Sequence, residues 1–198
     1  MTESDRAVPF GEGRQAILHA AIRLVAREGL SKCTYRSLAQ EARVAVGLVR
    51  HHFTSLDDVF ENALGVVYEV HAKRLKEASG FQGLIDMLAA TIEGELEYTQ
   101  FELEVLVGAR HRPSLHRAAE EYYAEIRRFT AAALVSAGQS ADQGTVELLT
   151  ALADGIAYER IVLGQSQIPR MRAQLEALQR LLPSSLTGVP TGLGAARA

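Results

Sequence analysis

The pattern of apolar residues between positions 34 and 42 predicts a short helix. Tyr35, Leu38, Ala39 and Ala42 stand at i, i+3, i+4 and i+7, which is the spacing of one buried helix face. Thr34 precedes this run, where its hydroxyl can accept a hydrogen bond from an amide of the first turn. We therefore expect a short helix that begins after Thr34 and packs through one face.

A second short helix is predicted after a break at residues 43–45. It extends from Val46 to about His52 and buries Val49 and the following Phe53. Two helices joined by a turn of this length form a helix-turn-helix, which lays its second helix in the major groove of DNA. This stretch is therefore a candidate DNA-binding element.

The outward-facing residues of the second helix suit contact with DNA. These are Val46, Gly47, Arg50 and His51. Arg50 can donate two hydrogen bonds to a guanine or pair with a phosphate, and Gly47 lets the backbone approach DNA closely. Helical domains that never bind DNA can carry the same spacing, so periodicity alone leaves both interpretations open.

A longer series of residues surrounds this element in a characteristic order. The series comprises Arg14, Ile17, Leu18, Ala20, Ala21, Leu24, Gly29, Thr34, Leu38, Ala39, Ala42, Val44, Gly47, His52 and Phe53. In this order, the stretch from about Arg14 to Phe60 resembles the amino-terminal domain of the TetR family of bacterial transcriptional repressors. The resemblance implies a sequence-specific DNA-binding regulator that binds a palindromic double-stranded DNA operator as a homodimer. It also implies that a small-molecule effector relieves repression.

Four positions depart from the family pattern. Arg43 replaces a turn glycine, and a left-handed conformation there would cost about 1–2 kcal/mol. Ala45 replaces a serine, which loses an N-cap worth about 1 kcal/mol and a phosphate contact. Arg50 replaces a tyrosine and Leu56 a lysine. These departures keep an alternative open, a helical protein that binds small molecules or partners through a degenerate helix-turn-helix without binding DNA.

The candidate DNA contacts combine the exposed positions with those that the resemblance implies. They are Thr34, Tyr35, Arg36, Ala45, Val46, Gly47, Arg50, His51 and His52.

Between its few turn signals the chain reads as helix almost throughout, which predicts an all-α fold. Gly29 can end the first helix in a left-handed conformation, and Ser55 can cap the helix that follows the helix-turn-helix. Helices are expected at about 11–29, 55–79, 81–98, 101–110, 114–137, 142–165 and 170–182.

The expected domains are an N-terminal three-helix helix-turn-helix DNA-binding domain, residues 1–55 (helix-turn-helix 34–53), and an α-helical ligand-binding and dimerisation bundle, residues 56–182. Residues 183–198 lack apolar periodicity and are expected to be a disordered tail. The formal net charge of −3 divides into +3 for the first domain and −6 for the remainder. The basic part therefore carries the helix-turn-helix, and dimerisation would double its charge.

The expected helix at 142–165 is apolar over more than one stripe, so it should contact both its own core and another surface. It resembles the eighth helix of TetR-type regulators, which forms a four-helix dimer interface with the last helix. An ordinary pair of core helices is the alternative. The candidate dimer contacts are Leu149, Ile156, Ile161, Leu175 and Leu178.

The bundle is rich in small residues and has few large aromatics, which allows a ligand cavity. The candidate pocket residues are Val67, His71, Met87, Thr91, Tyr122, Tyr123, Ile126 and Phe129. An acidic run in the same region is either a pocket for a cationic ligand or a solvated face. It comprises Glu93, Glu95, Glu97, Glu102 and Glu104.

Other features narrow the class of protein. No apolar run reaches the roughly 18 residues of a membrane span, and no signal peptide is visible, so we expect a cytoplasmic protein without a membrane partner. The lone Cys33 cannot form an internal disulfide. No catalytic or metal-binding motif occurs, so neither enzymatic activity nor a metal or cofactor is expected.

Overall fold

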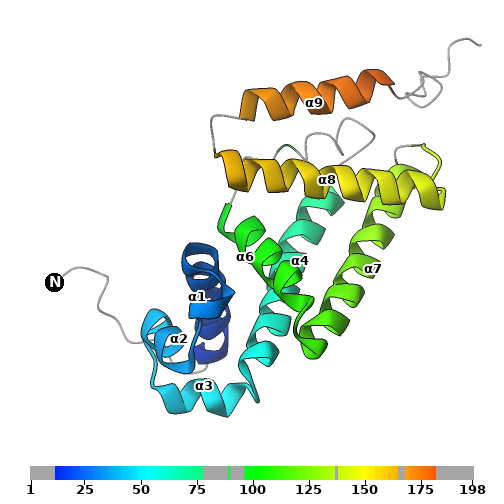
Figure 1. Cartoon of the computed structure of the whole chain (residues 1–198). Coiled ribbons are helices and arrows are strands. Elements are labelled where there is room, and N and C mark those ends of the chain that lie inside the picture. Colours follow the sequence, from blue (N-terminus) through cyan, green and yellow to red (C-terminus); the bar gives the residue numbers. More distant parts are fainter. Residues whose placement is uncertain (1–11, 78–88, 90–95, 137, 165–167, 182–198) are drawn as a thin grey trace, which may run out of the picture.

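The computed structural model describes residues 12–77, 89, 96–136, 138–164 and 168–181. All regular elements in these residues are helical, which confirms the all-α fold class (Figure 1). Helix α1 (Gly13–Glu28) and the 3-10 turn η2 (Leu30–Lys32) come first. They are followed by α2 (Tyr35–Ala42), α3 (Val46–His52) and the long α4 (Leu56–Glu77).

The second half of the chain forms the other end of the molecule. Its helices are α6 (Leu96–Ala109), α7 (Pro113–Ser136), α8 (Gln143–Leu163) and α9 (Ile168–Leu181). In Figure 1, α4 extends from α3 towards the bundle, and α8 and α9 lie at the end opposite α3. A change in the tilt of α4 would therefore move α3 relative to the bundle.

One predicted helix boundary is wrong. A break was expected between residues 98 and 101, but α6 runs through it without interruption. Neither Gly nor Pro occurs there, and Thr99 and Phe101 are both buried, so packing of this segment holds it in the helix. The earlier part of the helix predicted at 81–98 lies outside the described residues, as do Met87, Thr91 and the tail at 183–198.

The end of α1 also differs in detail from its prediction. Gly29 has a positive φ of 84°, as expected, but its ψ of 159° is extended rather than left-handed helical. Its amide still donates to the Val25 carbonyl at 2.8 Å. The backbone therefore leaves the helix at once and enters η2, a path that favours glycine.

The apolar core is continuous from α1 to α7. It includes Ile17 on α1, Leu38 on α2, Phe60 on α4, Phe101 on α6 and Leu115 on α7, all fully buried. The core therefore crosses the boundary proposed after residue 55, and the division into two domains stays a prediction.

Helix α6 packs closely against the turn η2. A Cβ atom at Gly108 would lie 2.4 Å from the Cδ2 atom of Leu30, so the glycine allows the approach. The Glu104 carboxylate accepts a hydrogen bond from the Leu30 amide at 3.3 Å. These contacts join the helix-turn-helix end of the chain to the bundle.

Candidate DNA-binding interface

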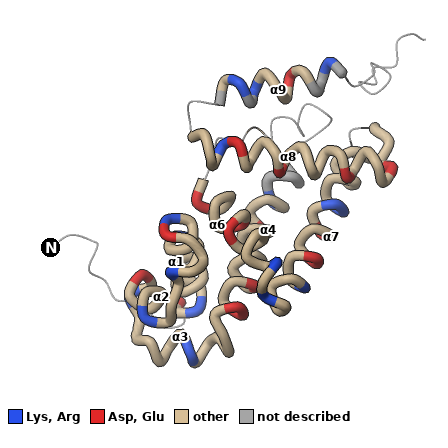
Figure 2. Tube along the Cα trace, in the orientation of Figure 1, with Lys and Arg blue, Asp and Glu red and all other residues tan. Residues whose placement is uncertain are grey.

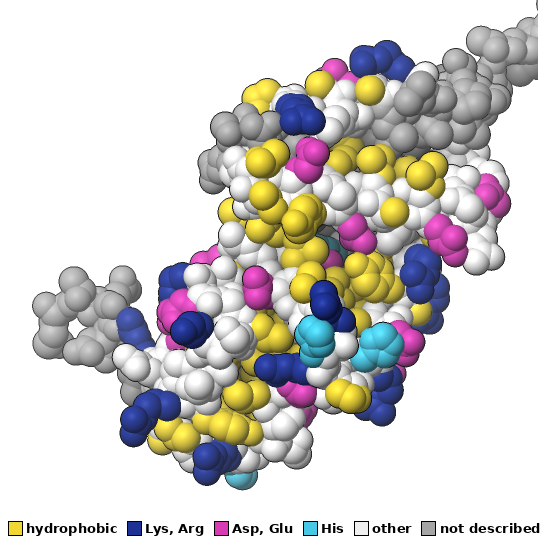
Figure 3. All heavy atoms as spheres, in the orientation of Figure 1, with side chains coloured by type: hydrophobic (Ala, Val, Ile, Leu, Met, Phe, Trp, Pro, Cys, Tyr) yellow, Lys and Arg dark blue, Asp and Glu magenta, His cyan; other side chains and the backbone are white. Residues whose placement is uncertain are grey.

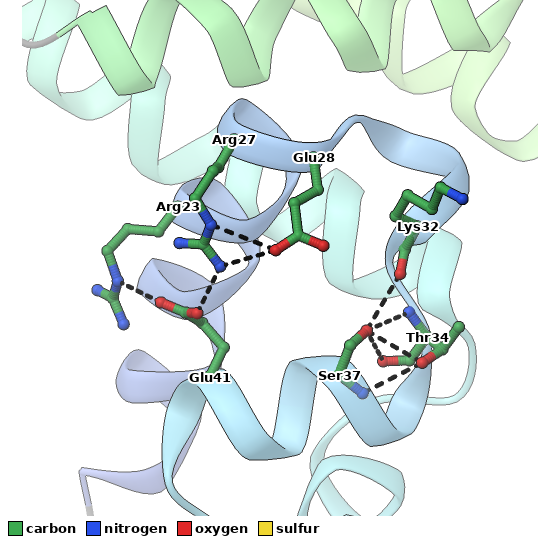
Figure 4. A network of polar contacts seen from close by, with 7 residues as sticks. All are labelled: Arg23, Arg27, Glu28, Lys32, Thr34, Ser37 and Glu41. Atoms are coloured by element: carbon green, nitrogen blue, oxygen red, sulfur yellow. Dashed lines mark hydrogen bonds and ion pairs between the residues drawn. The ribbon is translucent and has the colours of Figure 1, made fainter.

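A reciprocal cap starts helix α2. The Thr34 hydroxyl accepts a hydrogen bond from the Ser37 amide at 3.1 Å, and the Ser37 hydroxyl accepts one from the Thr34 amide at 2.9 Å (Figure 4). The Ser37 hydroxyl also lies 3.2 Å from the Lys32 carbonyl, to which it can donate. The predicted cap at Thr34 is confirmed, and it fixes the start of the helix-turn-helix to the turn before it.

The turn between α2 and α3 contains the one non-glycine residue with positive φ among the described residues. Arg43 has φ 55° and ψ 42°, the left-handed conformation that the resemblance implied. Its amide donates to the Gln40 carbonyl at 3.1 Å, and the Val44 amide donates to the Ala39 carbonyl at 2.9 Å. These bonds close the end of α2 and offset part of the cost of about 1–2 kcal/mol.

Helix α3 has the predicted bounds and the predicted orientation. Val49 is fully buried and Phe53 is 2% exposed, whereas Gly47, Arg50 and His51 are exposed. Val46 is 38% exposed, which is high for a large apolar side chain at a helix start. Ala45 provides no side-chain cap. The outward face of α3 is therefore available to DNA, and contact with DNA stays a prediction.

Arg50 on α3 is held against Tyr35 on α2. The guanidinium carbon of Arg50 lies 5.0 Å from the centre of the Tyr35 ring, which is half-buried. His52 is half-buried, and its ring packs edge-on against Phe53, with the centroids 6.3 Å apart. Arg36 is exposed on α2. Arg50 and Arg36 are thus better placed for DNA than His52.

A network of ion pairs fixes α1 to α2 (Figure 4). Glu41 accepts from Arg27 at 2.8 Å and from Arg23 at 3.0 Å, and Arg27 also bonds Glu28. The hydrogen bond from Arg27 is the main cause that lowers the pKa of Glu41. This network could not be predicted from the sequence, because helical periodicity does not say which polar faces meet.

Two further contacts connect this region with α4. Arg14 donates to Asn62 Oδ1 at 2.6 Å, and its guanidinium lies 5.3 Å from the centre of the Phe53 ring. The Ser55 hydroxyl accepts from the Asp58 amide at 3.0 Å, which confirms the predicted cap of α4. The start of α4 is therefore fixed to both α1 and the end of α3.

The first turn of α4 is also bound to α7. Asp57 accepts hydrogen bonds from Arg112 at 2.7 Å and from Ser114 at 2.6 Å. Arg112 and Ser114 flank the first residue of α7. This junction lies next to α3 along the chain and was not foreseen from the sequence.

Charge on the described helices agrees with this arrangement. Figure 2 shows Lys and Arg residues on α1, α2 and α3, at one end of the molecule. Arg23 and Arg27 on α1 are paired with Glu41, whereas Arg36 and Arg50 are exposed. The positive charge exposed on α2 and α3 is therefore available to a phosphate backbone.

A groove of about 390 Å³ lies between α4 and α7. Its lining comprises Glu61, Leu64, Gly65, Tyr68, Ala118, Glu121, Tyr122, Ala124, Glu125 and Arg128. Of the predicted pocket residues that the structure describes, only Tyr122 lines it. Val67 is fully buried in the core, and His71, Tyr123, Ile126 and Phe129 are half-buried. Tyr68, whose ring centre lies 6.4 Å from that of Tyr122, was not among the predicted residues.

Polar groups from three helices meet beside Tyr122, and we call them the acidic cluster. It consists of Glu102 on α6, Tyr122 and Tyr123 on α7, and Asp154 on α8. Burial raises the pKa of Glu102 to about 8; a polar contact with Tyr122 opposes this rise and the charge of Asp154 adds to it. Burial also raises the pKa of Asp154, although its hydrogen bond from Tyr123 acts in the opposite direction.

Helix α8 has one apolar stripe that is buried and another that is exposed. Leu149 and Ile156 are each 4% exposed and Leu175 on α9 is 2% exposed, so these predicted dimer contacts are covered within one protomer. Ile161 is half-buried, and the side chain of Leu178 lies outside the described residues. A neighbouring stripe is exposed instead, with Leu148 at 66%, Tyr158 at 59% and Val162 at 58%. Figure 3 shows hydrophobic side chains gathered where α8 lies.

An all-helical chain with an exposed, basic helix-turn-helix at one end has the architecture of a DNA-binding regulator. The family model of the bacterial regulatory proteins of the tetR family matches residues 17–63. The model of the tetracyclin repressor-like C-terminal domain matches residues 79–184. The chain belongs to the TetR family, and it is a DNA-binding transcriptional regulator. This membership does not favour the alternative of a helix-turn-helix that has lost DNA binding.

Relatives agree with this assignment. The HTH-type transcriptional regulator PksA of Bacillus subtilis (strain 168) is 27% identical over 166 residues, which cover 75% of this chain and 78% of PksA. A TetR family member from Streptomyces coelicolor A3 is 29% identical, with a TM-score of 0.71 over 87% of this chain and 99% of that one. The multidrug binding protein EbrR, in a crystal structure with ethidium, is also 29% identical, with a TM-score of 0.66 over 87% and 99%.

Two features are absent from the described residues. None of their helices is long and apolar enough to cross a membrane. The same residues contain no group of three or more His, Cys, Asp or Glu side chains that could hold a metal ion.

Proposed function

We propose that the protein is a homodimeric repressor that binds a palindromic operator and leaves it when a small molecule occupies the bundle. The observation that carries this proposal is the outward face of α3, where Arg50 is exposed and held against Tyr35. An arginine fixed in this way loses little side-chain entropy when it contacts a base or phosphate. The predicted contacts at Thr34, Arg36, Val46, Gly47 and His51 are exposed as well.

The exposed stripe of α8 supports a dimer. Leu148, Tyr158 and Val162 lie at i, i+10 and i+14 on that helix, with the exposed Ala151 and Gly155 between them. Residues with this spacing share one face of a helix, and small residues in its centre let a second helix approach closely. We assign the dimer contact to this stripe, in place of Leu149 and Ile156. A two-fold axis would then present two copies of α3 to successive major grooves.

The junction of α4 with α7 supports a link between ligand and operator. Asp57 sits in the first turn of α4, shortly after α3, and is bonded to both Arg112 and Ser114 at the start of α7. A ligand that moves α7 relative to α4 would therefore strain or shift the helix that carries α3. The linkage would weaken operator affinity by roughly 1–3 kcal/mol. The ethidium complex of EbrR is consistent with small-molecule binding in a similar bundle.

The decisive experiment is selection of duplex DNA from a random pool with the full-length protein. A palindrome should emerge, and binding to it should weaken steeply as salt concentration rises, because phosphate contacts release counterions. A half-site without symmetry would contradict the dimer. Absence of any enriched sequence, with unchanged retention of the pool at all salt concentrations, would contradict specific operator binding.

A further inference from the structure

We propose that the effector is an organic cation with an aromatic or apolar body, bound by the acidic cluster of Glu102, Tyr122, Tyr123 and Asp154. The inference rests on the proposed function, because it names the class of ligand that acts on the bundle. From the sequence alone, Glu102 is one member of an acidic run. Three independent features of the described residues carry the inference.

The first feature is a buried hydroxyl that lacks a bond of ordinary geometry. Tyr122 is 6% exposed, and its Oη atom has no hydrogen-bond partner among the described residues. Its contact with the Glu102 carboxyl falls outside normal hydrogen-bond geometry. An unsatisfied buried hydroxyl is costly, so a polar group that enters beside it gains a ready partner.

The second feature is the charge of the cluster. Within the described part of the chain, neither Glu102 nor Asp154 forms an ion pair with Lys, Arg or His. Asp154 is held by the Tyr123 hydroxyl at 3.1 Å, and burial together with the charge of Asp154 raises the pKa of Glu102. Glu102 and Asp154 are both half-buried. Above about pH 8, where Glu102 is ionised, the two carboxylates attract a cation and repel an anion. The carboxyls of Glu102 and Asp154 therefore indicate a positively charged ligand.

The third feature is a groove that shares Tyr122 with the cluster. Tyr122 belongs both to the cluster and to the lining of the groove between α4 and α7. Three glutamates, at positions 61, 121 and 125, line the groove together with a single cation, Arg128, which is paired with Glu125. The Tyr68 and Tyr122 rings pack edge to face there. Acidic side chains draw a cation towards the groove, and aromatic faces bind it.

The groove also has a suitable size. Its volume of about 390 Å³ falls within the range of small-molecule sites. A ligand with its apolar body between α4 and α7 and its charge towards Glu102 would touch the two helices that meet at Asp57. The same ligand would therefore act where α4 is bonded to α7.

The test uses two probes of equal shape and opposite charge, tetraphenylphosphonium and tetraphenylborate. Titration calorimetry on full-length protein should give clear binding of the phosphonium, with the borate at least about tenfold weaker, a difference of about 1.4 kcal/mol. The titrations are made at pH 9, where wild-type Glu102 is ionised. Glu102→Gln, which is neutral at every pH, should then weaken phosphonium binding about tenfold or more. Asp154→Asn should act in the same direction.

Glu97→Gln is the matched control, because it removes the same charge from an exposed position on the same helix. It should leave phosphonium affinity within about twofold of the wild type. Equal affinity for the two probes, or a Glu102→Gln variant that binds the phosphonium normally, would overturn the assignment. Circular dichroism of each variant confirms that folding is intact.

Operator binding is measured on the same preparations by fluorescence anisotropy. Protein that binds the selected operator but not the phosphonium at millimolar concentration would refute the cationic effector and leave the proposed repressor function standing. Protein that binds the phosphonium, with no change in operator affinity, would keep the site and refute its role as effector site. Protein that binds no operator at all would refute the proposed function itself.

Discussion

The guanidinium of Arg50 lies 5.0 Å from the centre of the Tyr35 ring, so a residue of α2 fixes the cation of α3. Tyr35 is half-buried and stands at the start of α2, directly after the Thr34 cap. Cation–π contacts at exposed sites are worth about 0.5–1 kcal/mol. The position of the Arg50 side chain on α3 therefore depends on Tyr35 of α2.

This pair gives a graded prediction for operator binding. Arg50→Ala should weaken it by about 1–3 kcal/mol, because a base or phosphate contact is lost. Tyr35→Leu should weaken it by a smaller amount, about 0.5–1 kcal/mol, because Arg50 remains but is no longer held. Anisotropy titrations at fixed salt measure both. If Arg50→Ala bound the operator like the wild type, Arg50 would leave the list of contacts.

Replacement of Gly47 by alanine should increase stability and weaken DNA binding. A Cβ atom there would have no neighbour within 4 Å, so alanine fits the free protein. Gly47→Ala should stabilise it by up to about 1 kcal/mol, because alanine favours the helix. Operator binding should weaken if the backbone at this position approaches DNA. Urea denaturation and anisotropy measure the two effects, and unchanged operator affinity would show that Gly47 does not approach DNA closely.

The exposed stripe of α8 makes a prediction about assembly. Tyr158→Glu and Leu148→Glu place a charge on the proposed dimer surface and should give folded monomers with weak operator binding. Leu149→Glu, one position away but buried, should instead unfold the protomer. Light scattering and circular dichroism separate these outcomes. A folded dimer of Tyr158→Glu would place the interface elsewhere.

The contrast between Leu148 and Leu149 shows what the sequence could predict and what it could not. Local spacing was enough to place Val49 and Phe53 in the core and Arg50 outside, because α3 has a single apolar face. Helix α8 is apolar on several faces, and periodicity does not say which face its own core covers. That choice depends on how α8 crosses α6 and α7, which is a tertiary property.

The candidate sites show the same limit. A solvated face was the favoured interpretation of the acidic run, and Glu97 and Glu104 are exposed, whereas Glu102 meets Tyr122 from another helix. The ion pairs between Arg23 and Glu41 and between Asp57 and Arg112 join segments whose sequence separation carries no signal. A single sequence specifies the helices far better than the pairing of their polar faces.

Glu102 should make stability depend on pH. The pKa of this side chain is about 8 in the folded chain, against an ordinary value of 4.5 that we take for the unfolded chain. Between these two values the folded state keeps a proton that the unfolded state releases, so stability falls as pH rises and levels off above about pH 8. Asp154, whose pKa is also raised, acts in the same direction from a lower starting value.

The measurement is urea denaturation of wild type and Glu102→Gln between pH 5 and pH 9. Glutamine cannot titrate, so the free energy of unfolding of the variant should fall much less as pH rises. The variant should therefore be the more stable protein at pH 8. Tyr122 and Tyr123 face the same cluster, but their pKa values are raised from 10.0 and they stay protonated over this range. Parallel curves for the two proteins would show that Glu102 titrates normally.

The bond between Asp57 and Arg112 should be measurable as a coupling between α4 and α7. Both side chains are partly covered, at 26% and 36% exposure, and the carboxylate also accepts from Ser114. A double-mutant cycle of Asp57→Ala and Arg112→Ala should therefore give a coupling of about 0.5–1 kcal/mol in the free energy of unfolding. The pair of His116 and Glu120 is the control, because it lies within α7, at 64% and 69% exposure and 3.6 Å apart. Its coupling should not exceed about 0.3 kcal/mol. If the two cycles gave equal values, the Asp57–Arg112 pair would be an ordinary surface contact, and the link from ligand to operator would have to run through the apolar packing of α4 on α7.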